Sequence, residues 1–270
     1  MWRRVALGLL AVFWGYLFYG VQDLVAFTMG PDFHDAVMLS AGWGVLFLVL
    51  VAAPLAAVAI EPPLGPVAAL VVGCDALAVL LAAVLSASPP HLAIAGGLSV
   101  TMLVAAPPRR TAAAMRQARP LVGPLAVTVV GAVPWGLYAL HCAATARGGT
   151  KPSDDTWGLD HWPVQAAVGF AISLVAVLSA TTVPGRRLAG AGSGLASGLL
   201  GAFFWAYPDV VGSASRWWAA AAVVWGAALL ASAYRTGLDQ DRRLDGDRDG
   251  SVPVRLGGVS LCCAGRRRCR

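Results

Sequence analysis

The chain has 270 residues, of which 58% are hydrophobic and 13% are charged, with a formal net charge of +6 and a mean hydropathy of +0.69. Soluble domains carry about 25% charged residues, so this composition excludes an ordinary soluble globular protein. Net positive charge can indicate nucleic-acid binding. Here, however, the positive residues cluster between apolar segments, which indicates membrane topology and no nucleic-acid partner.

Apolar segments long enough to cross a lipid bilayer recur along the chain. A helix needs roughly 20 apolar residues for a crossing, and continuously apolar segments favour helices over a β-barrel. The predicted fold is all-α, a polytopic integral membrane helix bundle. Its eight transmembrane helices are expected at about 5–28, 36–60, 66–87, 91–106, 121–145, 163–183, 189–207 and 216–234. The fourth segment is short, so seven crossings is the nearest alternative.

The basic residues predict the orientation of the bundle. If the loops alternate from a cytoplasmic N-terminus, all but three of the 20 Lys and Arg residues lie inside, the exceptions being Arg147, Lys151 and Arg216. The positive-inside rule then predicts eight crossings with both termini in the cytoplasm. A composition rich in Ala, Gly and Arg, with a single lysine, suits a GC-rich bacterial genome and hence the plasma membrane.

Two parts of different composition are predicted, a transmembrane domain at 1–235 and a charged cytoplasmic tail at 236–270. The start, MWRRVALGLL, has the charged flank of a signal peptide, but it continues into a long aromatic stretch, which predicts an uncleaved first span. The tail has too few apolar residues for a core and is expected to be disordered. Its C-terminal arginines are expected to contact anionic lipid.

Asp75 is the strongest single candidate for a functional residue. It lies near the middle of the third span, in VVGCDALAV, and no Lys or Arg lies in the interior of any span to neutralise it. A carboxylate at the bilayer centre costs at least about 2.5 kcal/mol on insertion scales. We therefore expect Asp75 to be protonated, hydrogen-bonded or occupied by a cation. Thr101, at a similar depth in the fourth span, is the expected side-chain partner.

Further polar residues lie toward the outer side under this topology. Asp23, in the outer third of the first span, is either a second proton-relay point or a carboxylate that reaches the outer interface. The stretch DDTWGLDHWPVQ, at 154–165, leads into the sixth span. Its Asp160, His161 and Gln165 are predicted to line a vestibule that binds a proton or a solute, with the start of a membrane helix as the alternative interpretation.

The histidines suggest a possible divalent metal site on the same side. His34, Asp35, His141 and His161 are the candidate ligands, because imidazole and carboxylate suit Zn²⁺, Cu²⁺ or Fe. Their spacing matches no metal motif, and ordinary interfacial residues are the alternative. No other cofactor is indicated.

Tryptophans and glycines predict packing rather than chemistry. The tryptophans expected to anchor the bundle at the outer interface are Trp157, Trp162, Trp205, Trp217 and Trp218. Trp43 and Trp135 lie deeper and need a partner for the indole N–H. Gly190, Gly194 and Gly198 recur at four-residue spacing and predict close helix contact.

Three functions remain open at the level of sequence. The first is transport of a small solute or ion, with Asp75 as the proton or cation site. The second is a membrane-embedded enzyme or redox protein with the outer metal, and the third is a structural or accessory membrane protein.

FWGYLFYG at 13–20 resembles PWGLYALH at 134–141, which suggests a parallel duplication of four spans, as in many transporters.

Overall fold

The structure is a computed structural model that describes residues 2–28, 36–149, 155–156 and 158–248. It divides into two compact units, Met1–Tyr234 and Arg235–Arg270. The described elements are α1 (Trp2–Val12), η1 (Phe13–Leu17), α2 (Gly20–Leu24), η2 (Ala26–Thr28), α3 (Val37–Gly44), η4 (Val45–Ala52), α4 (Ala53–Ile60), η5 (Pro62–Leu64), α5 (Gly65–Leu85), α6 (Pro90–Ala105), α7 (Pro108–Gln117), α8 (Val122–Arg147), β1 (Asp155–Thr156), β2 (Leu159–Asp160), α9 (His161–Ser179), α10 (Arg186–Ala206) and α11 (Arg216–Arg248). The predicted all-α class is confirmed.

Six helical segments of the described chain are long and apolar enough to cross a membrane. They are Val37–Ile60, Pro62–Leu85, Val122–Arg147, His161–Ser179, Arg186–Ala206 and Arg216–Arg235. Each coincides with a predicted segment, and these apolar helices are compatible with a multi-pass membrane protein. The pair α6 and α7 counts as a seventh only if the two helices, bent by 85° at their junction, form one span.

The first predicted span is broken. Helix α1 passes into the π-helical η1, and the chain leaves helical geometry at Phe18 and Tyr19 before α2 begins at Gly20. Tyr19 has a φ of 64°, a left-handed conformation that is costly for a residue with a Cβ. The indole Nε1 of Trp43 donates a hydrogen bond of 2.7 Å to the carbonyl oxygen of Phe18. Trp43 therefore ties the backbone at the break to α3.

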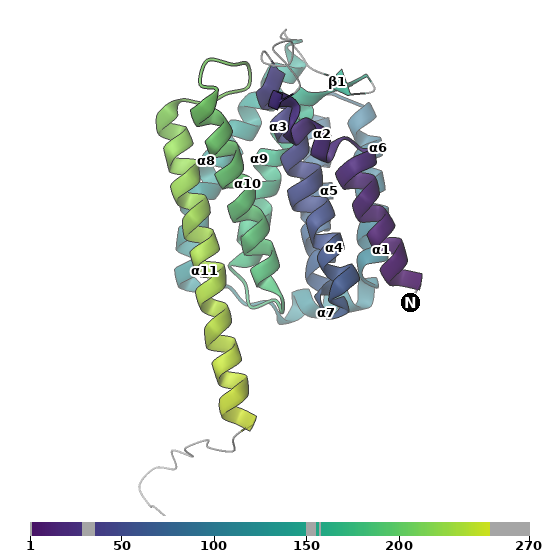
Figure 1. Ribbon diagram of the computed structural model, residues 1–270, viewed down its shortest axis with the longest axis vertical. Coiled ribbons are helices and arrows are strands. Elements are labelled where there is room, and N and C mark those ends of the chain that lie inside the picture. The colour runs from purple at the N-terminus through teal and green to yellow at the C-terminus, as the bar shows by residue number, and fades with distance from the viewer. Residues whose placement is uncertain (1, 29–35, 150–154, 157, 249–270) are drawn as a thin grey trace, which may run out of the picture. The chain divides into compact units, whose positions relative to one another are not determined.

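Polar residues gather at the two ends of the bundle in the first unit. Arg3 donates hydrogen bonds to the carbonyl oxygens of Val104 and Ala105, where α6 ends. The link between α7 and α8 pairs with the loop between α9 and α10 through Pro120 and Thr181. Figure 1 shows the N-terminus and α7 at this end and β1 at the opposite end. We call the first the arginine end, which comprises Arg3, Arg4, Arg109, Arg110, Arg116, Arg119, Arg186 and Arg187. The opposite end is the histidine end, which comprises Asp23, His91, Asp160 and His161.

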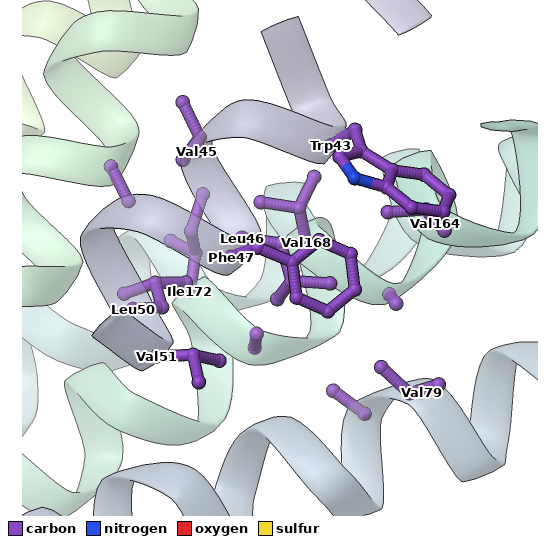
Figure 2. Packing of buried hydrophobic residues seen from close by; sticks show 14 of the residues in the cluster. Trp43, Val45, Leu46, Phe47, Leu50, Val51, Val79, Val164, Val168 and Ile172 are labelled. Atoms are coloured by element: carbon purple, nitrogen blue, oxygen red, sulfur yellow. The ribbon is translucent and has the colours of Figure 1, made fainter. Parts of the chain in front are cut away.

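Helix α9 lies at the centre of this unit, because it packs against α3, α5, α8 and α10. Its aliphatic side chains meet aromatic side chains of the second span (Figure 2). These residues form a layer that we call the apolar layer, comprising Trp43, Phe47, Val79, Val164 and Val168, and each is at most 1% exposed.

The glycines of α10 bring α11 into close contact, as the sequence predicts. A Cβ atom on Gly194 would lie 2.8 Å from the carbonyl oxygen of Gly226, and one on Gly190 would lie 2.8 Å from Cβ of Ala233. A Cβ atom on Gly226 would lie 2.9 Å from the backbone nitrogen of Gly198. The predicted close contact is confirmed for Gly190 and Gly194, whereas a Cβ atom on Gly198 would meet nothing within 4 Å.

Helix α11 continues to Arg248, beyond the predicted end of the membrane domain at residue 235. The tail is predicted to be disordered over 236–270, but residues 236–248 belong to α11. Residues 249–270, which include its last arginines, lie outside the described residues.

Candidate functional site

Asp75 lies in the middle of α5 and is fully buried. Neither of its carboxylate oxygens has a hydrogen-bond partner among the residues that the structure describes. Val79, one helical turn closer to the histidine end on the same face of α5, belongs to the apolar layer. The apolar layer therefore lies between Asp75 and the histidine end in this conformation.

Thr101 is not the partner of Asp75. The indole Nε1 of Trp14 donates to Thr101 Oγ1 at 3.1 Å, and this hydroxyl donates to the carbonyl oxygen of Gly97 at 2.9 Å. The expected pairing of Thr101 with Asp75 is wrong, because α6 turns the face that carries Thr101 toward η1.

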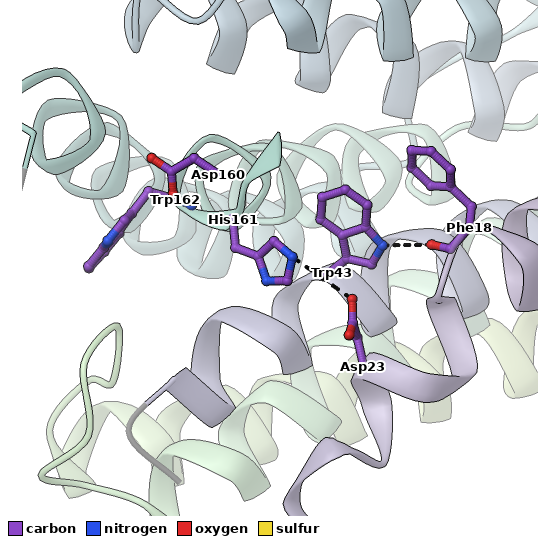
Figure 3. Close-up of polar contacts among 6 residues, drawn as sticks. All are labelled: Phe18, Asp23, Trp43, Asp160, His161 and Trp162. Carbon is purple, nitrogen blue, oxygen red and sulfur yellow. Dashed lines mark hydrogen bonds and ion pairs between the residues drawn. The ribbon is translucent and has the colours of Figure 1, made fainter. Parts of the chain in front are cut away.

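Asp23 and His161 come together at the histidine end (Figure 3). Asp160 is the N-cap of α9, and its carboxylate accepts a hydrogen bond of 3.0 Å from the backbone N–H of Trp162. This cap starts the helix at His161, whose Nε2 lies 4.0 Å from Oδ2 of Asp23. The imidazole of His161 also lies against the indole of Trp43, with ring centroids 4.6 Å apart.

Gln165 lies one turn further along α9, so it shares a face with His161. Its Nε2 donates to the hydroxyl of Tyr138 at 2.6 Å, and that hydroxyl donates to the carbonyl oxygen of Gly212 at 2.6 Å. Its Oε1 lies so close to Gly42 that a Cβ atom there would be 1.6 Å away. This oxygen is buried without a hydrogen-bond partner among the described residues, so Gln165 offers an unused acceptor inside the bundle.

His91 joins the same region from α6. Its Nδ1 lies 2.7 Å from Ser88 Oγ, and its imidazole interacts electrostatically with Asp160 and His161. The sequence placed His91 at the start of a span but did not single it out as a site residue, since a lone histidine at a helix start carries no spacing signal. We call the group Asp23, His91, Asp160, His161 and Gln165 the histidine cluster.

The predicted metal ligands do not assemble in the described part of the chain. His141 is exposed on α8, whereas His161 is fully buried. His34 and Asp35 lie outside the described residues. Among those described, no group of three or more His, Cys, Asp or Glu side chains could hold a metal ion.

The tryptophans divide between exposed and buried positions. Trp205 and Trp217 are exposed, as an interfacial anchor requires, but Trp162 is only 4% exposed, so its predicted anchor role is wrong. Trp162 is buried because α9, which it begins, is the central helix of the bundle. Trp218 packs against Trp135 and Tyr138 and is only partly buried, while Trp157 lies outside the described residues. The deep Trp135 donates from Nε1 to Ser197 Oγ at 3.2 Å, as the sequence requires of a buried indole.

The bundle thus contains a buried carboxyl group, Asp75, and a separate cluster of imidazole, carboxylate and amide groups, with apolar side chains between them. A carboxyl group can hold a proton or a cation, and imidazole and carboxylate groups can bind a proton or a polar solute. No protein-family model, curated protein or solved structure matches this chain.

Proposed function

We propose that the protein crosses the plasma membrane of a bacterium eight times, with both termini in the cytoplasm. Six crossings are the helices long enough to span. Helix α6, with 16 residues and a length of about 24 Å, supplies another. The broken segment from α1 to α2 supplies the eighth. Helix α7, which is rich in arginine and bent by 85° from α6, lies along the membrane surface.

The arginine end supports this orientation. Eight arginines of the first unit lie there, whereas the histidine end carries the acidic and imidazole groups of the cluster. The positive-inside rule places the arginine end in the cytoplasm. The histidine cluster then lies at the extracytoplasmic end of the bundle.

We further propose that the protein transports a small solute or ion and uses Asp75 as its proton or cation site. The observation that carries this proposal is the complete burial of Asp75 with both oxygens free of hydrogen bonds from the described residues. A carboxyl group in this setting costs free energy, and such groups in membrane helices mark ion and proton pathways. Among the described residues, none donates a hydrogen bond that would offset the free-energy cost of burying this carboxyl group.

Two features of the histidine end support the same function. Transporters bind substrates and coupling ions beside discontinuous helices, and the first span is broken at Phe18 and Tyr19, next to Asp23. Asp23 and His161 form a contact that can exchange a proton with the outside. The histidine cluster is thus the proposed outer vestibule, with Asp160 and Gln165 as further contacts for a solute.

Proton movement through Asp75 can be tested without knowing the solute. Purified protein in liposomes loaded with a pH-sensitive dye is exposed to a potassium diffusion potential, and the rate of internal acidification is measured. We expect wild-type vesicles to acidify several-fold faster than empty vesicles, Asp75→Asn to fall to the empty-vesicle rate, and Glu61→Gln to match wild type. Glu61 is the matched control because it is an exposed carboxylate at the junction of α4 and η5. A wild-type rate equal to that of empty vesicles, or an Asp75→Asn rate equal to wild type, would refute the role of Asp75.

A further inference from the structure

A groove of about 670 Å³ runs between the first span and α6. One wall is formed by Leu10, Phe13 and Trp14, and the other by Ile94, Gly97 and Thr101. Its size falls within the range of about 300–1,000 Å³ that is typical of small-molecule sites.

The polar atoms of the groove wall are already used within the protein. Trp14 donates its indole N–H to Thr101, and Thr101 donates its hydroxyl to the carbonyl oxygen of Gly97. The other lining side chains that form the two walls are hydrocarbon or aromatic. A polar ligand would have no hydrogen-bond partner on these walls, so the ligand that suits the groove is a hydrocarbon chain.

The groove opens toward lipid, because its lining includes the exposed apolar side chains of Phe13 and Val100. Along α6 it extends from Pro90 to Thr101, which at 1.5 Å per residue is about 17 Å. One leaflet of a bilayer has a hydrocarbon thickness of about 15 Å. The groove therefore has the length of an acyl chain of one leaflet.

One end of the groove reaches polar groups. Phe18, Pro90 and Leu159 line that end, and the last two directly precede His91 and Asp160 of the histidine cluster. An amphiphile whose chain lies in the groove would thus place its polar head at the histidine end, where the membrane surface lies.

A second crevice, between α8 and α11, shows that an open groove is not a general feature of helix pairs in this fold. It measures about 150 Å³, and the indole of Trp225 fills the space beside Gly131, where a Cβ atom would lie 2.0 Å from the ring. Trp14 and Trp135, which occupy matching places in the two similar sequence stretches, each line one of the crevices. Large side chains narrow the crevice beside Trp135, so it is much smaller than the groove beside Trp14.

We propose that the groove between the first span and α6 binds one acyl chain of a phospholipid from the leaflet at the histidine end. This inference depends on the protein lying in a membrane but not on transport through Asp75. A bound lipid chain would complete the packing of η1 against α6.

The probe is phosphatidylcholine that carries a photoreactive diazirine in its acyl chain, incorporated in vesicles with the full-length protein. After irradiation, cross-linked peptides are quantified by mass spectrometry. We expect peptides containing Phe13 or Ile94 to be labelled several-fold more than a peptide of the lipid-exposed surface of α8 around Val130.

Two variants provide the matched comparison. Ala93→Phe places a ring in the groove, and Ala126→Phe makes the same change at an exposed position of α8 outside it. We expect Ala93→Phe to lower the labelling of the groove peptides to the level of the α8 peptide, and Ala126→Phe to leave it unchanged. Equal labelling of groove and α8 peptides in wild type, or undiminished groove labelling in a folded Ala93→Phe variant, would overturn the proposal. Displacement of the label by unlabelled free fatty acid but not by unlabelled phosphatidylcholine would overturn phospholipid as the occupant.

Discussion

Replacing Asp75 with valine should stabilise the protein. A polar group buried without a hydrogen bond costs about 1–3 kcal/mol, and Asp75 has no such bond from the described residues. Valine removes that desolvation cost. Its slightly larger volume crowds the neighbouring side chains, which offsets part of the gain in stability. We expect a net gain of about 1–2 kcal/mol in the free energy of unfolding, which at roughly 2–4 °C per kcal/mol raises the melting temperature by several degrees.

Thr101→Val is the control, and its effect should have the opposite sign. Valine has nearly the shape of threonine but cannot accept the hydrogen bond from Trp14, so a buried indole N–H is left unpaired. The expected loss is about 1–3 kcal/mol. Both variants can be followed by tryptophan fluorescence during heating in detergent. A destabilised Asp75→Val variant would refute the reasoning, since it would mean that the carboxyl group of Asp75 forms bonds that favour the folded state.

Two other contacts give predictions of defined size. Trp43→Phe keeps an aromatic side chain but removes the hydrogen bond to the Phe18 carbonyl and leaves a small cavity at a fully buried site. We expect a loss of about 1–3 kcal/mol and faster amide hydrogen exchange at 18–24, with Trp217→Phe as an exposed control. If exchange at 18–24 stays at the wild-type rate, Trp43 does not hold the break. Gly194→Ala forces α10 away from Gly226 and should cost about 1–3 kcal/mol of stability measured by thermal unfolding. Gly198→Ala, whose Cβ would meet nothing within 4 Å, should be neutral or slightly stabilising; similar losses in both variants would contradict the close-contact argument.

Hydropathy alone could predict most of the helices, because the length of a continuous apolar segment matches the hydrocarbon thickness that a membrane helix must cross. The burial of Asp75 and the contacts of Gly194 follow from the same logic of depth and helical face. The break at Tyr19 could not be predicted, since tyrosine has no preference for a left-handed conformation and the hydrogen bond from Trp43 comes from another span.

The partners of polar side chains were also beyond the sequence. Thr101 and Asp75 are predicted to lie at a similar depth in the membrane. Depth does not determine toward which neighbouring helix each side chain points. Thr101 therefore meets Trp14, and the expected pair does not form. The burial of Trp162 was missed for a related reason, because the sequence places it at a membrane surface without showing that α9 is the central helix.

The proposed proton exchange between Asp75 and the histidine end would require the apolar layer to open. Helix α9 is poorly suited to move, because it packs against four other helices and is buried along most of its length. The broken first span is better suited, since Tyr19 holds a left-handed conformation at the break and Trp43 ties the Phe18 carbonyl oxygen to α3. Trp43 belongs both to that tie and to the apolar layer, and its ring also contacts His161. A change in the contact between Asp23 and His161 would therefore act on a side chain that belongs to the apolar layer and also holds the break in place.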